Sequence, residues 1–441
     1  MPGRYRLLAD ITPLRQSAAF RRVWAGATVS AVGGALTTFA VTLQVYDLTR
    51  SPLAVGAIGV AQAVPTLAIG LLAGAVADAI DRRKLVLTTS TCLAAVSAVL
   101  AAQAFAGLAL VWLLYVLVAV QSALGAVDRP ARSTFLPGLL PTSQLPAALA
   151  LNRLSFQIVL TVGPAVAGLI AADPHLGIRA CYLLDTVSFA VSLYGVVRLP
   201  PLRPQGDTAR PGLGAVAARL SFIRRSQVLA GAFLADLNAT VFGLPVALFP
   251  AINAERFGGS PRTLGLFTAA IGIGGLASAA FSGPVRHVSR QGLAMLVAVA
   301  VWGAAFAGFA VVPSLWLTLV LLAVAGAADT FTVVFRGTIV QMVTPDQLRG
   351  RVMAADYVVG AGGGQLGNLE AGALGSLTSP VISALTGGLV TVAGAIAIGL
   401  ALPAFARYRG QQSDRAQQGL TTAATASSTP GGNGVPDLEP R

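Results

Sequence analysis

Acidic side chains stand inside long apolar stretches of the chain at Asp236, Asp329 and Glu370. A charged residue at the centre of a bilayer costs about 2.5–3.5 kcal/mol on insertion scales, so its presence needs a reason. A desolvated carboxyl group is easier to protonate, so it can load a proton on one side of a membrane and release it on the other. We predict proton coupling at these carboxyls, with Asp236 first, then Glu370, then Asp329.

Further polar residues in apolar stretches are candidates for a substrate cavity. Asn238 follows Asp236 closely, and Gln44 and Asp47 lie near the end of the first apolar stretch. We predict that these side chains supply polar contacts to a substrate in a mainly apolar site. The competing interpretation is that each polar residue makes a structural hydrogen bond between helices, and the sequence leaves this alternative open.

Other chemistries find little support in the sequence. Lys84 is the only lysine and does not belong to a nucleotide-binding Gly-x4-Gly-Lys-Ser/Thr loop. No Ser/His/Asp set or His-Glu-x-x-His motif stands out, and His175 and His287 are too few for a multi-histidine metal site. Cys92 and Cys181 lie in apolar runs, as small buried side chains do. We expect no enzyme activity, no cofactor and no metal.

Composition identifies the elements that must position these residues. Of the 441 residues, 55% are hydrophobic and 11% are charged, against about 25% charged in soluble proteins. Mean hydropathy is +0.74. The net charge of +13 does not indicate nucleic-acid binding, because the basic residues fall in short clusters between apolar runs. The chain is therefore predicted to be a polytopic membrane protein, embedded in a lipid bilayer, with no nucleic-acid partner.

A transmembrane helix needs about 20 mainly apolar residues. This criterion predicts an all-α membrane protein with twelve transmembrane helices. The first six cover roughly 21–46, 53–77, 85–105, 109–128, 147–172 and 178–198. The second six cover roughly 227–250, 263–285, 292–312, 315–335, 349–376 and 381–405.

Basic residues predict the orientation of these helices. If the N-terminus is inside, nearly all of the 30 Lys and Arg residues fall in inner segments. Arg153 lies in a predicted span, and the four outer exceptions are Arg50, Arg179, Arg256 and Arg262. The positive-inside rule therefore predicts that both termini are cytoplasmic.

The predicted helices divide into two halves. Residues 1–198 and 226–406 each hold six, and the Pro- and Gly-containing segment 199–225 is predicted to be a cytoplasmic linker. Residues 407–441 turn polar and are expected to form a disordered cytoplasmic tail. Two six-helix bundles related by pseudo-symmetry are a recurrent transporter plan, with the substrate site between the halves.

A weak internal repeat supports this division. Gln144-Leu145 follows the fourth predicted span, and Gln347-Leu348 follows the tenth. Aligning the two pairs places Arg153 opposite Asp356. We predict that these two charges form a bridge between the halves.

The loop after the second span carries the most specific motif. Gly74 is followed four residues later by Asp78 and then by the basic residues Arg82 and Arg83. This spacing resembles the signature loop of the major facilitator superfamily. Ala79 stands where that family commonly has a basic residue, and the fold that the resemblance implies is the major facilitator fold.

The resemblance implies a cytoplasmic gate. Asp78 would pair with an arginine or a helix N-terminus of a neighbouring span and hold the cytoplasmic side closed. Arg129, Arg153 and Asp356 are the other candidates for this gate. The alternative is that the basic cluster only signals orientation.

Gly163, Pro164 and Gly168 in the fifth span are similar to the Gly-Pro motif of antiporters in the same superfamily. Proline frees a backbone carbonyl and bends the helix, and glycine permits close packing. The motif favours export, and a packing kink without directional meaning is the alternative.

Three further segments resemble the exporter branch that includes enterobactin exporters and macrolide efflux proteins. These are the opening from Phe20 to Tyr46, Asp128-Arg-Pro-Ala-Arg132, and Leu348-Arg-Gly-Arg351. The resemblance implies a monomeric secondary transporter of the bacterial inner (cytoplasmic) membrane that exports amphipathic, drug- or siderophore-like molecules by proton antiport. The alternatives are an importer or facilitator of a small metabolite, or a non-transporting sensor or assembly protein on a transporter scaffold.

Overall fold

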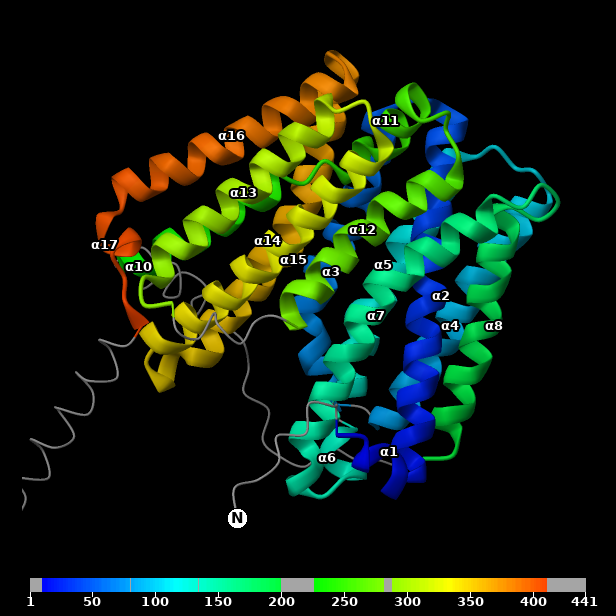
Figure 1. Cartoon of the computed structure of the whole chain (residues 1–441). Coiled ribbons are helices and arrows are strands. Elements are labelled where there is room, and N and C mark those ends of the chain that lie inside the picture. Colours follow the sequence, from blue (N-terminus) through cyan, green and yellow to red (C-terminus); the bar gives the residue numbers. More distant parts are fainter. Residues whose placement is uncertain (1–9, 80, 134, 200–225, 281–287, 411–441) are drawn as a thin grey trace, which may run out of the picture.

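Long helices form from the apolar stretches in the computed structural model, which describes residues 10–79, 81–133, 135–199, 226–280 and 288–410 (Figure 1). All elements assigned in these ranges are helices. The first long helices are α2 (Ala18–Thr49), α3 (Pro52–Ala79), α4 (Arg82–Phe105), α5 (Val111–Ser133), α7 (Leu145–Ala171) and α8 (Ile178–Val197). The later ones are α10 (Gln227–Phe242), α12 (Pro261–Ala280), α13 (Gln291–Val311), α14 (Leu315–Val343), α15 (Asp346–Leu377) and α16 (Pro380–Ala401).

Shorter helices complete the described chain. They are α1 (Thr12–Gln16), α6 (Leu136–Leu139), η1 (Thr142–Gln144), η2 (Val246–Leu248), α11 (Phe249–Arg256) and α17 (Pro403–Ala406). The stretch predicted as the seventh span is interrupted between Gly243 and Pro245, so that α10, η2 and α11 together replace one helix. Proline explains the interruption because it lacks a backbone N–H and restricts the residue before it.

Side-chain caps fix where several helices begin. Ser17 accepts a hydrogen bond from the backbone N–H of Phe20 at the start of α2. The carboxylate of Asp81 accepts from the N–H groups of Arg83 and Lys84 at the start of α4. Such caps satisfy N–H groups that have no partner within the helix. The polar residues at these boundaries therefore stop one apolar stretch and start the next.

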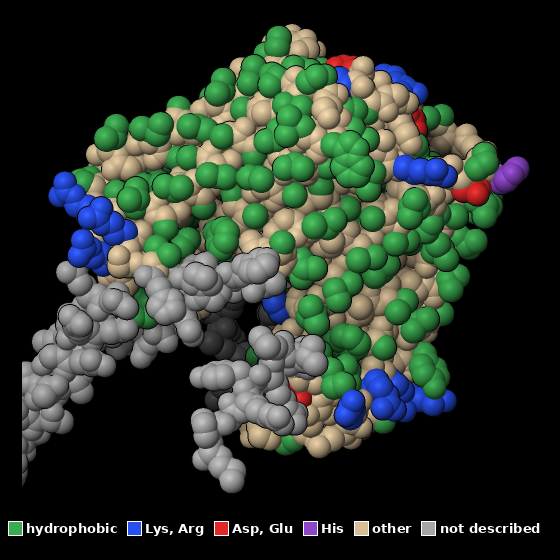
Figure 2. Space-filling view, in the orientation of Figure 1, with side chains coloured by type: hydrophobic (Ala, Val, Ile, Leu, Met, Phe, Trp, Pro, Cys, Tyr) green, Lys and Arg blue, Asp and Glu red, His purple; other side chains and the backbone are tan. Residues whose placement is uncertain are grey.

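Eleven helical segments of the described chain are long and apolar enough to cross a membrane. Their outward faces carry many large apolar side chains, including Trp316 at 80% and Leu400 at 79% exposure. Hydrophobic side chains cover much of the face seen in Figure 2, whereas basic side chains gather toward its edges. An apolar surface of this extent is expected where lipid, not water, surrounds the helices.

The cysteines differ in their surroundings. Cys181 on α8 is buried, whereas Cys92 on α4 is exposed. The prediction that both cysteines are buried is therefore wrong for Cys92, because a membrane helix also presents small apolar side chains on its outward face.

Two helix pairs join the earlier helices to the later ones. α3 packs along α15, and α7 packs along α12. Both contacts lie near the end that carries the turns at 50–51, 172–177 and 378–379, which we call the turn end. From there the two groups of helices diverge toward the opposite end, where α1 and α6 lie in one group and α17 in the other (Figure 1).

Glycines allow these two contacts to be close. A Cβ atom at Gly168 of α7 would lie 2.9 Å from the Cα of Gly265 on α12. A Cβ atom at Gly59 of α3 would lie 2.8 Å from the carbonyl oxygen of Gln365 on α15. Helix backbones approach this closely only where the side chain is absent or very small. We call these two contacts the glycine seams.

Candidate functional site

Asp236 forms a buried ion pair with Arg336, and the two residues join α10 to α14. Only 4% of Asp236 and 9% of Arg336 are exposed. The span predicted at 315–335 ends one residue before Arg336, and this predicted end is wrong. Helix α14 continues to Val343, so that Arg336 lies within it and turns inward toward the acid. Burying both charges together is far less costly than burying either one alone.

Asp329 lies two turns before Arg336 on the same helix. The residue is exposed in the structure. The charges of Asp236, Arg336 and Arg153 all act on the Asp329 carboxylate. The structure therefore brings two of the three predicted carboxyls together, and it adds an arginine from α14 and a second from α7.

Arg153 on α7 adds a positive charge from the earlier group of helices to this cluster. Its side chain is exposed on α7, and its guanidinium carbon lies 6.0 Å from the ring centroid of Phe156. In the described part of the chain, no carboxylate lies within ion-pair distance of Arg153. The cluster thus contains one buried ion pair, Asp236–Arg336, and two exposed charges of opposite sign, Asp329 and Arg153.

Glu370 and Asn238 lie elsewhere. Asn238 donates a hydrogen bond to the carbonyl oxygen of Thr391 on α16, at 2.8 Å. Glu370 is partly buried on α15, and none of the ion pairs recorded in the described chain includes it. Its neighbour Asn368 accepts a hydrogen bond from the backbone N–H of Ala247 at 3.2 Å. These contacts fit the helix-to-helix alternative for Asn238.

Gln44 and Asp47 also lie away from the charged cluster. Gln44 is buried and exchanges hydrogen bonds with Gln103 at 3.1 Å in both directions. It also accepts a hydrogen bond from the hydroxyl of Tyr182 at 2.7 Å. Asp47 lies near the turn end and pairs with Arg50 at 3.5 Å, where both side chains are more than half exposed. Gln44 therefore ties α2, α4 and α8 together.

The predicted antiporter-like motif lies in a glycine seam. Gly168 faces Gly265 across the contact of α7 with α12, and the carbonyl oxygen of Pro164 lies 2.6 Å from where a Cβ of Gly265 would be. A Cβ at Gly163 would lie 2.7 Å from the Cβ of Ala35 on α2. The motif residues thus pack α7 against both groups of helices.

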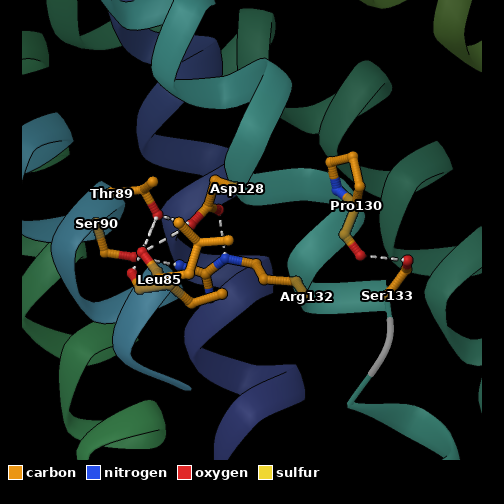
Figure 3. A network of polar contacts seen from close by, with 8 residues as sticks. Leu85, Thr89, Ser90, Asp128, Pro130, Arg132 and Ser133 are labelled. Carbon is orange, nitrogen blue, oxygen red and sulfur yellow. Dashed lines mark hydrogen bonds and ion pairs between the residues drawn. The ribbon is translucent and has the colours of Figure 1, made fainter. Parts of the chain in front are cut away.

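A polar network joins α4 and α5 near the opposite end (Figure 3). Buried Asp128 accepts hydrogen bonds from the hydroxyls of Thr89 at 2.6 Å and Ser90 at 3.4 Å. It also pairs with Arg132 at 2.5 Å, and Arg132 donates to Ser90 at 2.6 Å. Arg129, the next residue after Asp128, is exposed and outside this network.

The predicted cytoplasmic gate is described only in part. Arg83 donates a hydrogen bond to the carbonyl oxygen of Val197 at 2.6 Å, which ties the start of α4 to the end of α8. Arg82 begins α4. Gly74, Asp78 and Asp356 lie in the described helices α3 and α15, but their side chains lie outside the described residues. The gate contacts of Asp78 and Asp356 therefore stay predictions.

Two residues of functional interest were not among the predicted site residues. Arg336 was hidden because the predicted span ended one residue before it, and the apolar run that continues to Val343 was the available signal. Asp185 on α8 was visible as an acid in a span, but nothing in the sequence indicated its partners. The structure shows Asp185 completely buried.

An apolar groove of about 320 Å³ lies between α13 and α14, lined by residues such as Val297, Val301, Val324 and Phe331. It contains none of the predicted site residues. The charged cluster, and not this groove, is the candidate functional site.

Comparisons of sequence agree with these features. A family model described as transmembrane secretion effector matches residues 8–428. The enterobactin exporter EntS of Citrobacter koseri is 27% identical over 417 residues, which cover 92% of this chain and 97% of the relative. The enterobactin exporter EntS of Shigella boydii serotype 18 is 27% identical over 412 residues, covering 91% and 96%.

Comparisons of structure show the same fold at lower identity. A POT family transporter in complex with 5-aminolevulinic acid has a TM-score of 0.72 at 10% identity, covering 88% of this chain and 97% of the other. The nucleoside transporter NupG has a TM-score of 0.65 at 15% identity, covering 89% and 100%. A bacterial homologue of the iron transporter ferroportin, in an inward-facing state, has a TM-score of 0.64 at 16% identity, covering 88% and 98%.

Proposed function

Because the chain belongs to the transmembrane secretion effector family of major facilitator transporters, we propose that it exports amphipathic small molecules across the cytoplasmic membrane by proton antiport. The chain is a membrane transporter and not an enzyme. The direction, the coupling ion and the substrate class are the parts that we propose.

The proposed architecture has twelve transmembrane helices in two pseudo-symmetric bundles of six. The segment α10–η2–α11 counts as one span, and α15 completes the twelve beside the eleven apolar segments. With 32 residues, α15 is about 48 Å long, which exceeds the thickness of a hydrocarbon core of about 30 Å. The bundles are residues 1–198 and 226–406, and a cytoplasmic linker at 199–225 joins them.

The observation that carries the proposal is the exposed carboxylate of Asp329 beside the Asp236–Arg336 pair. A proton that binds Asp236 must displace Arg336, whereas a proton that binds Asp329 breaks no ion pair recorded in the described chain. We therefore assign the coupling proton to Asp329, and we give Asp236 and Arg336 the role of positioning residues. This changes the order predicted from sequence, in which Asp236 came first.

Arg153 makes Asp329 responsive to the movement of the bundles. The C-terminal cluster of two acids and one arginine has a net negative charge when Asp329 is ionised, and Arg153 brings a positive charge from the N-terminal bundle. Their attraction favours approach of α7 and α14, which would close the cytoplasmic side. Protonation of Asp329 removes that attraction and favours opening to the cytoplasm, where the proton leaves and substrate enters.

The packing at the turn end supports alternating access. The glycine seams hold the bundles together there, while the helices diverge toward the opposite end (Figure 1). The four arginines Arg50, Arg179, Arg256 and Arg262 are few compared with the basic residues predicted for the opposite end. The positive-inside rule then makes the opposite end cytoplasmic and the described conformation inward-facing.

The substrate class follows from the relatives and from the composition of the spans. The curated relatives are named enterobactin exporters, and the chain is 55% hydrophobic with only 11% charged residues. We propose siderophore-like or drug-like amphipathic molecules as substrates. The small number of polar groups predicts loose recognition.

Transport in reconstituted vesicles tests the proposal. Purified protein is placed in proteoliposomes with an imposed pH gradient, and enterobactin and a panel of amphipathic drugs are followed. The expected result is movement of at least one compound against the direction of proton flow, and Asp329→Asn abolishes this movement. Asp173→Asn is the matched control, because Asp173 is an exposed acid in the turn at 172–177 and belongs to none of the predicted sites, and it leaves transport unchanged.

Two outcomes would overturn the proposal. Movement of a compound in the same direction as protons would identify an importer. Movement that follows the concentration gradient alone and ignores both the pH gradient and Asp329→Asn would identify a facilitator.

A further inference from the structure

Asp185 is the centre of a polar junction inside the N-terminal group of helices, away from the charged cluster. Its exposure is 0%. One oxygen of its carboxyl group, Oδ2, lies 2.7 Å from the hydroxyl of Thr37 on α2 and 2.6 Å from the hydroxyl of Ser97 on α4. Three helices therefore meet at one carboxyl group.

The other oxygen, Oδ1, has no hydrogen-bond partner among the described residues. It faces Gly33 of α2, where a Cβ atom would lie 2.5 Å from it. Glycine at this position brings the backbone of α2 against the carboxyl group and leaves no room for a further side chain. The hydroxyl of Ser188 lies against the same glycine and acts on the carboxyl group, but its recorded hydrogen bond goes to the backbone carbonyl oxygen of Asp185.

The surroundings of Asp185 contain no compensating charge in the described part of the chain. No arginine, lysine or histidine from α2, α4 or α8 acts on its carboxyl group. The nearest titratable neighbours along α8 are Cys181 and Tyr182, and the Tyr182 hydroxyl donates to Gln44 instead. Thr37, Ser97 and Ser188 are the polar side chains at the junction, and all three are neutral.

An ionised carboxylate in this place is physically unfavourable. Transfer of a lone charge from water to an apolar interior is far more costly than burial of a neutral polar group. Two hydroxyl donors do not replace the hydration that the carboxylate loses, since a carboxylate offers about four acceptor sites. A neutral carboxylic acid needs only one acceptor for its proton, and either hydroxyl oxygen at the junction can accept it.

We propose that Asp185 is a second proton-binding site of this protein, which holds its proton within the N-terminal bundle and thereby ties α2, α4 and α8 together. The hydrogen bond to Ser97 or Thr37 then runs from the acid to the hydroxyl. Asp185 differs in this from Asp329, whose carboxylate is exposed and must exchange its proton. The part of the proposal that contrasts the two acids rests on the proposed function, but the protonation of Asp185 does not.

The distances favour a proton over an alkali cation. Oxygens that share a proton lie about 2.5–3.0 Å apart, and the oxygens at this junction are 2.6 and 2.7 Å apart. Oxygens that ligate one cation are kept apart by the ion between them, whereas hydroxyl and carboxyl oxygens as close as these share a proton. The short oxygen–oxygen distances at this junction are therefore those of hydrogen bonds.

The corresponding junction of the later helices uses a neutral amide. Asn238 on α10 bonds to Thr391 on α16, and Gly394 of α16 lies against the Asn238 side chain. In the proposed repeat, α10 corresponds to α2 and α16 to α8. The polar residue lies on α8 in the first half and on α10 in the second, and the facing glycine lies on α2 and on α16, so the two have exchanged helices. An amide both donates and accepts, as a protonated carboxyl group does and a carboxylate does not.

Infrared spectroscopy of the purified full-length protein in detergent tests the proposal. A protonated carboxyl group has a carbonyl stretching band that an ionised carboxylate lacks. The wild-type protein is expected to show such a band at neutral pH, and Asp185→Asn is expected to remove it while the protein stays folded. Asp47→Asn is the matched control and removes no protonated-carboxyl band, because Asp47 is exposed and paired with Arg50.

A wild-type measurement covers the case in which Asp185→Asn does not fold. The protonated-carboxyl band is expected to persist at pH 8, where exposed carboxyl groups are ionised. Absence of the band at pH 8, or a folded Asp185→Asn spectrum that keeps the full band, would overturn the proposal. A band that disappears when sodium replaces choline in the buffer would instead identify an alkali-cation site and would also overturn it.

Discussion

The buried pair Asp236–Arg336 gives the sharpest prediction about stability. Substituting either partner alone leaves the other charge buried, with 4% exposure for Asp236 or 9% for Arg336. Breaking a buried pair in this way costs about 3–5 kcal/mol. At about 1.4 kcal/mol for each factor of ten, the folded-to-unfolded ratio is expected to fall by a factor of about 100 or more in Asp236→Asn and in Arg336→Gln.

The double variant Asp236→Asn/Arg336→Gln tests whether the cost comes from the unpaired charge. Two neutral amides leave no buried charge, so the double variant is expected to be more stable than the sum of the single effects predicts. The coupling free energy is expected to be at least as large as one single effect, about 3–5 kcal/mol. Reversible unfolding in mixed micelles, followed by the helical circular dichroism signal, measures all four proteins.

Arg153→Gln is the matched control for these measurements. It also removes an arginine from the charged cluster, but Arg153 is exposed and belongs to none of the ion pairs of the described chain. Its stability is expected to stay within about 0.5 kcal/mol of wild type. If Asp236→Asn or Arg336→Gln is as stable as Arg153→Gln, or if the double-variant effects simply add, the reasoning about this pair is refuted.

Three further predictions concern the packing and the caps. Gly168→Val places atoms against the α12 backbone, so cross-linking of α7 to α12 at the turn end should fall severalfold, while Gly34→Ala, which meets nothing within 4 Å, should leave it unchanged. Asp128→Ala removes the acceptor shared by α4 and α5 and should lower the free energy of unfolding by about 1–3 kcal/mol; an equal loss in the exposed neighbour Arg129→Gln would contradict this. Asp81→Ala removes the cap of α4 and should cost about 1 kcal/mol by the same unfolding measurement; an unchanged stability would show that the cap is dispensable.

The helical fold could be predicted from the sequence because a bilayer imposes a simple rule on it. Apolar length alone located the long helices, and the eleven apolar segments agree with the predicted spans. The residue type of Pro245 indicated an interruption of the helix nearby. The exact residues at which the helices begin and end could not be predicted. Arg336 shows why, because the run after it could indicate that the helix continues to Val343 but not that the arginine turns inward toward Asp236.

The partners of the polar residues could not be predicted, because they belong to helices far apart in the chain. Asp236 was identified as a coupling candidate, yet its partner lies 100 positions away. Gln44 was expected in a cavity, but it bonds to Gln103 and Tyr182. In each case the residue type indicated that a polar contact must exist, and only the packing of helices distant in the chain determined which contact it is.

Proton flux measured together with substrate flux tests the central proposal most directly. Proteoliposomes carrying wild-type protein and an internal pH indicator are given a transported compound, and both fluxes are recorded. Wild type is expected to move protons opposite to the substrate, whereas Asp329→Asn is expected to show no substrate-dependent proton flux. Substrate-dependent proton flux that persists in Asp329→Asn would contradict the assignment of the coupling proton to Asp329.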